Sequence, residues 1–280
     1  MFKNYSGLIL YELNEVPRKL YDFYIKKNPS SSFAFFKEKG LVFDTFTRDE
    51  GELHPWSTWP TVHRGVSNSI HNIRFINQDL TQSIMYPPIW EILIKEGINV
   101  GIFGSLQSYP PIYNKNVNFY LPDTFSPEPS AYPNEFMEFQ KFNLNLVGHN
   151  KGISRSINAN QIFQFLELKL KGNISNKAFL KTTAHLLKEL ISKKYKTRRA
   201  LLQPVLSFDL YFKFLKKTKP KFSTYFTNHL AGVLHRYWKH LFPKDFNISL
   251  SQVNTFHSKS IIKAMDITDQ QIGRLLNFSK

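Results

Sequence analysis

The apolar run LILYEL, residues 8–13, constrains the fold more than any other feature of the chain. Its nearly continuous hydrophobicity is typical of a strand buried on both faces of a parallel sheet. The segment MYPPIWEILIKEGINVGIFGS, residues 85–105, then predicts a helix, a glycine stop and another strand. This alternation predicts an α/β fold with a mostly parallel sheet covered by helices on both faces.

The remaining segments are assigned from periodicity and from residues that end helices. We expect helical structure over 17–39, near 60–66, through most of 158–219 with Asn158 or Asn160 as the cap, through 235–242 and over 259–278. We expect further strands beginning at residue 40, at 117–125 and at 221–230.

Positive charge is concentrated in one part of the chain. The formal net charge is +16, and residues 151–220 hold 16 Lys and Arg against three acidic residues, so +13 of that charge lies there. A Pro/Ser-rich boundary precedes this part. We therefore divide the chain into the N-terminal part of an α/β core (1–125), a basic helical insertion or cap (126–219) and a return to the core (220–280).

The composition excludes several classes of protein and of functional site. No apolar run approaches the roughly 20 residues of a membrane span, and the N-terminus lacks the features of a signal peptide. The chain has no cysteine, which excludes disulfides, thiolate metal sites and a cysteine nucleophile and suits a reducing compartment. We therefore expect a cytoplasmic location.

The stretch HPWSTWPTVHRGVSNSIHNI, residues 54–73, collects the hydroxyls Ser57, Thr58 and Thr61 at the start of an expected helix. A helix N-terminus favours an anion, and a nearby divalent metal lowers the pKa of a hydroxyl that acts as a nucleophile. The alternative is that Ser57 or Thr58 only caps the helix.

Three windows resemble the alkaline phosphatase superfamily, and most closely its type I phosphodiesterase/nucleotide pyrophosphatase branch. The first is LILYELNEV with Asn14 at the strand end, and the second holds Thr58-Trp59-Pro60, Gly65 and His71-Asn72-Ile73. The third is YFTNHLAGVLHRYW, residues 225–238.

The resemblance implies two-step displacement at phosphorus, with Thr58 as the nucleophile and Ser57 and Thr61 as competitors. It implies two divalent ions, zinc with manganese as the alternative. The residues carried over as metal ligands are Asn14, Glu15, His229 and His235, with Glu12 as an alternative to Glu15. Ser57 and His71 are carried over as substrate-binding, His71 with a structural role as its alternative.

The chain departs from the family pattern in three places. Asn14 stands where the family has a ligand Asp, Ala231 stands four residues before His235 where an Asp is expected, and no Asp-His pair occurs in the chain. We therefore expect either a chain truncated before an Asp-His-Gly metal segment or a degenerate relative.

Other ionisable residues receive weaker assignments. Asp266 and Asp269 are expected to cap or to face solvent, with a ligand role as the alternative. His54, His63 and His149 are taken as ordinary polar residues.

Two functions of different classes follow. The first is a metal-dependent hydrolase or transferase acting on phosphate mono- or diesters of a small molecule, glycan or lipid. The second is a catalytically inactive relative that acts as a binding or scaffold module through its basic helices.

The basic helices also suggest partners. Because aromatic residues are interleaved with the basic residues, we expect contact with an anionic membrane. Nucleic-acid binding is disfavoured, because no recognised module accompanies the charge; the sequence does not predict the oligomeric state.

Overall fold

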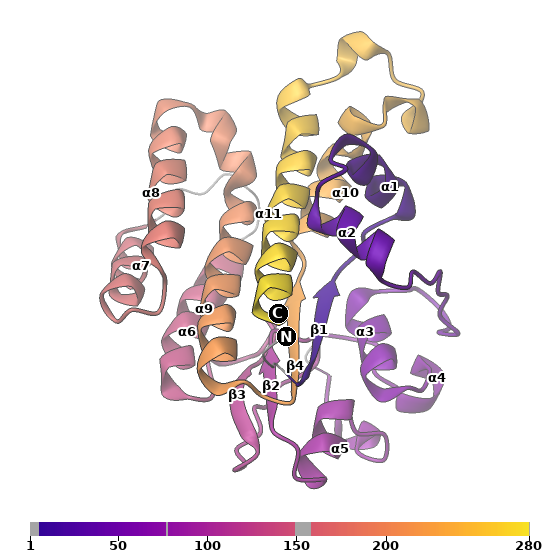
Figure 1. Ribbon diagram of the computed structural model, residues 1–280, viewed down its shortest axis with the longest axis vertical. Coiled ribbons are helices and arrows are strands. Elements are labelled where there is room, and N and C mark those ends of the chain that lie inside the picture. Colours follow the sequence, from indigo (N-terminus) through magenta and orange to yellow (C-terminus); the bar gives the residue numbers. More distant parts are fainter. Residues whose placement is uncertain (1–5, 77, 149–157, 280) are drawn as a thin grey trace.

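The computed structural model describes residues 6–76, 78–148 and 158–279. At its centre lies a four-stranded parallel sheet with the strand order β1-β4-β2-β3 (Figure 1). The strands are β1 (Leu8–Leu13), β2 (Val100–Phe103), β3 (Val117–Leu121) and β4 (Phe222–Thr227). The predicted α/β fold with a parallel sheet is confirmed. Because Leu13 pairs with Thr227, residues 14 and 228 leave the sheet side by side.

One face of the sheet is covered by α3 (Pro55–Arg64) and α5 (Ile89–Lys95). Trp90 and Ile94 of α5 pack on Val100 and Ile102 of β2 in one buried cluster. The short α4 (Asn68–His71) follows α3. The predicted sequence of helix, glycine and strand over 85–105 is confirmed, because Gly97 has the left-handed φ of 74° between α5 and β2.

The opposite face is covered by α6 (Asn134–Gly148) and α9 (Leu202–Thr218). Phe208 and Tyr211 of α9 share one buried cluster with Phe119 and Tyr225 of the sheet. Gly101 faces the same layer: a Cβ there would lie 2.3 Å from the Phe119 ring, so only glycine leaves room for that ring.

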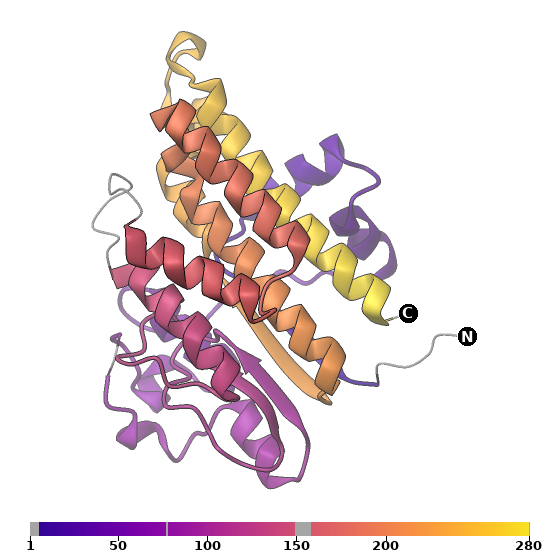
Figure 2. The ribbon, with the colours of Figure 1, turned by 90° about the vertical axis from the view of Figure 1, so that its left-hand side faces the viewer.

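A further layer of helices lies outside this one. It consists of α7 (Ala159–Leu170), capped as predicted by Asn158, and α8 (Asn176–Ile191). Figure 2 shows α8, α9 and α11 running alongside one another on this side of the sheet. Residues 134–218 therefore contribute both to the core and to a more exposed surface.

A second apolar cluster lies beyond the carboxyl ends of β1 and β4. It joins α1 (Arg18–Lys27), α2 (Ser32–Lys39), α10 (His229–Leu241) and α11 (Thr255–Ser279). Its central contact is between α10 and α11, where Leu230 and Val233 share the cluster with Ile261 and Met265. Short 3₁₀ segments complete the structure at Thr81–Ser83, Lys193–Leu201, Pro243–Phe246 and Leu250–Gln252.

The strand expected from residue 40 is wrong. The segment 40–50 has no regular secondary structure. Its apolar side chains Leu41, Phe43 and Phe46 remain exposed, so the segment neither pairs with the sheet nor buries these residues in the core.

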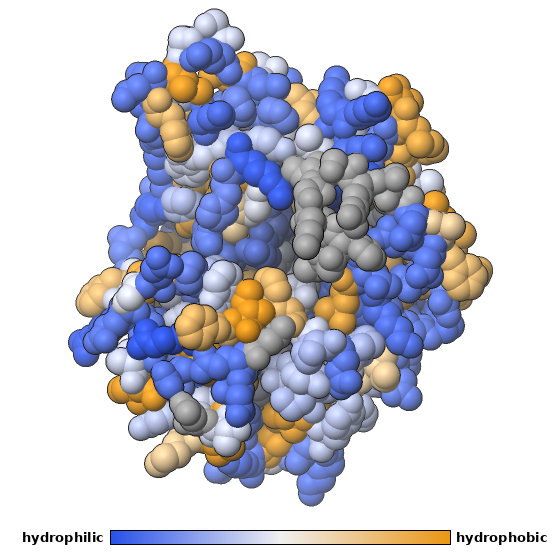
Figure 3. All heavy atoms as spheres, turned by 180° about the vertical axis from the view of Figure 1, so that it is seen from behind, coloured by the Kyte–Doolittle hydropathy of each residue, from blue (hydrophilic) through white to orange (hydrophobic). Residues whose placement is uncertain are grey.

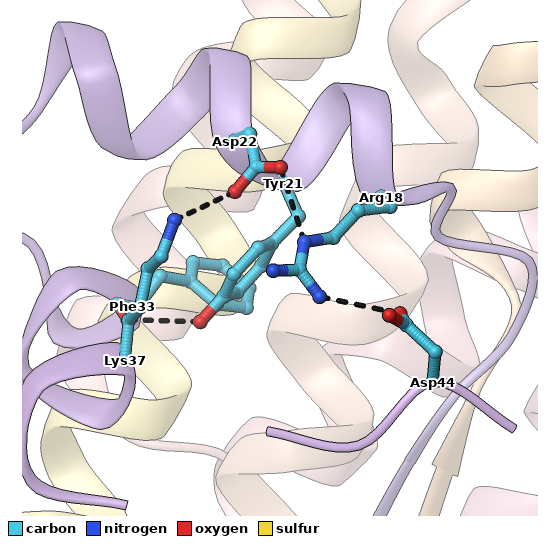
Figure 4. Close-up of polar contacts among 6 residues, drawn as sticks. All are labelled: Arg18, Tyr21, Asp22, Phe33, Lys37 and Asp44. Carbon is cyan, nitrogen blue, oxygen red and sulfur yellow. Dashed lines mark hydrogen bonds and ion pairs between the residues drawn. The ribbon is translucent and has the colours of Figure 1, made fainter. Parts of the chain in front are cut away.

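An ion pair between Arg18 and Asp44 joins this segment to α1 (Figure 4). The Arg18 guanidinium lies 3.0 Å from Asp22 of the same helix and 3.2 Å from Asp44. Lys37 of α2 lies 2.8 Å from the other oxygen of Asp22. The segment is therefore a connection that follows the surface of α1. Within the described ranges, no helix has both the length and the apolar character needed to cross a bilayer.

Candidate functional site

Asn14 joins three elements at the carboxyl edge of the sheet. Its side-chain Oδ1 accepts a hydrogen bond of 2.9 Å from the Trp59 indole on α3, and its Nδ2 donates to Asn228 Oδ1 at 2.7 Å. Asn14 is buried, with 4% of its surface exposed. It therefore fixes the first turns of α3 against the ends of β1 and β4.

Glu15, the next residue, faces outward and meets His235 of α10. Its backbone adopts a left-handed φ of 54°, and its Oε2 lies 2.6 Å from His235 Nε2. The side chains are 39% and 69% exposed, respectively. Of the four residues carried over as metal ligands, three thus lie together at this edge: Asn14, Glu15 and His235.

His229 faces in another direction, although it follows β4 directly. Its Nδ1 lies 2.7 Å from Thr227 Oγ1, and its Nε2 lies 3.2 Å from the Ala264 carbonyl and 3.1 Å from Thr268 Oγ1 on α11. Burial lowers its pKa to about 4, so the ring is neutral. Both ring nitrogens are therefore hydrogen-bonded inside the protein, away from His235.

Thr58 lies in the first turns of α3 without capping it. The N-cap is His54, which makes no side-chain cap bond, and the Thr58 hydroxyl donates to the His54 carbonyl at 3.1 Å. The proposed alternative of Thr58 as an N-cap is therefore wrong. Its oxygen lone pairs and partial exposure leave it able to approach a substrate after releasing this bond.

Thr61 and His71 belong to a different network on the α3–α4 side. Thr61 Oγ1 lies 2.8 Å from both carboxylate oxygens of Asp49 and 2.9 Å from His71 Nε2. Burial, followed by the nearby Arg64, lowers the pKa of His71 to about 4. Because His71 Nδ1 accepts from the Ile73 N–H, the neutral ring donates through Nε2 to Thr61, and Thr61 donates to Asp49.

The other predicted substrate-binding residue, Ser57, is buried. Its Oγ accepts from Asn68 Nδ2 at 3.2 Å, and it is 2% exposed. This contact ties α3 to α4, as Thr61 and His71 also do.

The buried pairing of Glu12 with His63 was not predicted from the sequence, where Glu12 was an alternative metal ligand and His63 an ordinary polar residue. His63 Nε2 on α3 lies 2.9 Å from Glu12 Oε1 on β1, and Ser105 after β2 donates to the same oxygen at 3.2 Å. Among the described atoms, Glu12 Oε2 and His63 Nδ1 have no hydrogen-bond partner. A charged Glu inside an apolar strand was the available indication, because such a side chain needs a buried partner.

The remaining candidates have structural contacts. Asp266 accepts from the Tyr24 hydroxyl at 2.8 Å, and Asp269 accepts from the Phe33 N–H at 3.0 Å. They tie α11 to α1 and α2. His54 stacks on Trp56 with ring centroids 4.5 Å apart, and His149 lies outside the described residues.

A two-ion centre needs more donors than this edge supplies. In the part of the chain that the structure describes, no three His, Asp or Glu side chains gather where one metal ion could hold them. Glu15 and His235 form a pair, and Asn14 adds an amide oxygen that already accepts from Trp59. This is fewer donors than a two-ion centre requires.

Comparisons with known protein families, curated proteins and solved structures find no match for this chain.

Proposed function

We propose that the carboxyl edge of the sheet hydrolyses or transfers a phosphate mono- or diester, with Thr58 as the nucleophile. The observation that carries the proposal is the solvent-accessible Glu15–His235 pair, 2.6 Å apart, beside Asn14. In open α/β sheets, ligands bind beyond the carboxyl ends of the strands. Trp59, the neighbour of Thr58 on α3, is hydrogen-bonded to Asn14 at this edge, which supports placing the attacking hydroxyl on α3.

Glu15 and His235 would hold one divalent ion, zinc or manganese, since carboxylate and imidazole suit either metal. When bound, such an ion neutralises charge on phosphoryl oxygens. The protein's own contribution is orientation. The positive end of the α3 dipole favours an anionic phosphate, and the contact with the His54 carbonyl fixes the Thr58 hydroxyl.

The substrate class is a phosphorylated small molecule, glycan or lipid. Positive charge over 151–220 supports an anionic substrate, because it raises the rate of encounter with anions. The lack of cysteine suits a reducing compartment, and we place the activity in the cytoplasm.

The test is hydrolysis of a chromogenic phosphodiester by the zinc- or manganese-loaded chain and by Thr58→Ala. Removing a nucleophile lowers turnover by on the order of a thousandfold or more. Thr218→Ala is the matched control, because Thr218 makes the same hydroxyl contact to a helix carbonyl on α9. Activity that survives Thr58→Ala, or that is absent from the metal-loaded chain, contradicts the proposal.

A second candidate is a binding module that docks on an anionic membrane surface, whether or not the chain is catalytic. Exposed apolar side chains lie on α7 and α8: Phe163, Leu166, Leu170, Leu180, Leu187, Leu190 and Ile191. Figure 3 shows apolar surface along its right-hand edge, on the side of the molecule where these two helices lie. Lysines 169, 177, 181 and 188 lie on the same helices. An apolar face with flanking lysines is typical of helices that bind anionic lipid surfaces.

Sedimentation with vesicles tests this candidate. We expect binding to vesicles containing phosphatidylserine, weaker binding to phosphatidylcholine alone, and loss of binding in Leu187→Glu/Leu190→Glu. Leu250→Glu places the same charge on an exposed leucine in another part of the chain and should bind normally. Equal binding by both variants would exclude α8 as the docking face.

A further inference from the structure

A cavity of about 480 Å³ lies in the helical layers, away from the candidate site. Its walls come from the turn before α8, the second half of α9 and the last turns of α11. This volume is within the range of small-molecule pockets, about 300–1,000 Å³. The lining includes none of Asn14, Glu15, Thr58 and His235.

The charged residues around the cavity are mostly positive. Lys213, Lys216, Lys217 and Arg274 line it together with one acid, Asp209. The Asp209 carboxylate is already occupied, since it accepts from the Ser175 N–H at 2.6 Å and pairs with Arg274 at 3.3 Å. The three lysines therefore leave the cavity with a net positive charge.

Two of these lysines are available to a ligand. Lys213 donates to the Gly172 carbonyl at 2.8 Å. Lys216 and Lys217 are exposed, and neither pairs with a carboxylate of the described residues. Lys216 lies over the Phe212 ring at 5.0 Å, and Arg274 lies over the same ring at 4.4 Å. Phe212 thus supplies an aromatic wall between two cations.

An unsatisfied buried donor lies at the same place. Asn173 lines the cavity and is 98% buried, since its exposed fraction is 2%. Its Nδ2 has no hydrogen-bond partner among the described atoms, although a buried amide without a partner is costly. The N-terminus of the 16-residue α8, capped by Ser175, lies beside it. At this end of α8 the Ser175 N–H already donates to Asp209 and the Ala178 N–H to Ser175 Oγ, so the donor beside the cavity that lacks a partner among the described atoms is the Asn173 amide.

We propose that this cavity binds the phosphate group of a phosphomonoester. Lys216 and Lys217 supply the charge, Asn173 supplies an amide N–H donor, and Phe212 packs against the rest of the ligand. The ligand is either a free phosphomonoester or the headgroup of a phosphomonoester lipid. The site does not depend on Thr58, Glu15 or His235.

The test is titration calorimetry of the full chain with glycerol 1-phosphate, alongside sedimentation with vesicles containing phosphatidic acid. Lys216→Gln/Lys217→Gln should weaken binding by about tenfold or more, since each lysine lost removes a charge-assisted contact. Lys26→Gln/Lys27→Gln is the matched control, because these two exposed lysines are adjacent in the last turn of α1, as Lys216 and Lys217 are in the last turn of α9. Circular dichroism confirms that each variant is folded.

The outcomes separate the two ligand sources. Binding of glycerol 1-phosphate that weakens only in Lys216→Gln/Lys217→Gln supports a free phosphomonoester. Binding of phosphatidic acid vesicles alone, with the same selective loss, supports a lipid headgroup. Equal loss of binding in both double variants would show that binding depends only on the net charge of the protein, and this would overturn the proposal. Absence of binding to either probe would also overturn it.

Discussion

The Glu15 carboxylate and the His235 imidazole lie 2.6 Å apart, although 220 residues separate them in the chain. They meet because β1 and β4 are neighbours in the sheet, with Leu13 opposite Thr227. The second residue after β1 and the second turn of α10 therefore face the same solvent-accessible point. This relationship links the first and third windows of the sequence that carry the resemblance.

Zinc binding should depend on this pair. We expect Glu15→Gln and His235→Gln each to weaken zinc affinity by about tenfold or more, because even the loss of an outer-shell partner costs about 10–100-fold. Titration calorimetry at pH 7.5 measures the change. His240→Gln is the control, since His240 lies on α10 outside the pair. Zinc affinity unchanged in both pair variants would exclude this point as the metal site.

Trp59→Phe should destabilise the fold by about 1–2 kcal/mol. The substitution keeps an aromatic ring but removes the N–H that satisfies buried Asn14 Oδ1, and a buried acceptor left unsatisfied costs about that much. Urea denaturation measures the change. In Trp238→Phe the lost partner is Asp245 at an exposed contact, where water replaces it, so the effect should be below about 0.5 kcal/mol. Equal effects would show that the Asn14 contact contributes no special stability.

The sequence predicted those elements whose pattern is local. LILYEL and the helix-to-glycine-to-strand segment at 85–105 carry their own periodicity, so neighbouring residues specify them. The apolar residues from 40 to 46 have a similar composition, but the sheet places β4 beside β1 and leaves these residues outside. A strand forms only where it can pair with a neighbouring strand, and an apolar sequence pattern does not specify which strand that is.

The candidate site shows the same division. Asn14, Glu15 and His235 were proposed from the resemblance to a family, and they lie together because residues that follow neighbouring parallel strands meet at one edge of the sheet. The orientation of His229 could not be predicted, because it depends on α11 packing above it and supplying the Ala264 carbonyl. Glu12 and His63 likewise find each other only through the packing of α3 on the sheet. Side-chain direction is thus set by tertiary contacts that no local pattern contains.

Stability should fall as pH decreases from 6.5 toward 4, and His229 should account for part of the loss. Its pKa is about 4 in the folded protein, because burial disfavours the imidazolium, against about 6.5 when unfolded. The unfolded state therefore binds the proton first. The contribution is fully present above pH 6.5 and is lost as pH falls through the folded pKa, amounting to about 3 kcal/mol.

Urea denaturation at pH 7.5 and pH 5 measures this dependence. His229→Gln retains an amide N–H for the Ala264 carbonyl and does not titrate, so its stability should change less between the two pH values. An identical change in the variant and the parent chain would show that His229 is not protonated on unfolding.

Gly101→Ala should destabilise the chain by about 1–3 kcal/mol, the usual cost of overpacking a core. An added Cβ would lie 2.3 Å from the Phe119 ring, which is itself fully buried between α6, α9 and the sheet, so the ring has no space to retreat. Thermal or urea denaturation checks the change.

Gly232→Ala should have the opposite effect. Gly232 lies within α10, and an added Cβ would meet nothing within 4 Å. There alanine should stabilise by about 0.5–1 kcal/mol, because it restricts the unfolded chain and favours the helix. Opposite signs at the two glycines would confirm that Phe119 closely contacts β2, whereas a neutral Gly101→Ala would show that this face of the sheet is loosely packed.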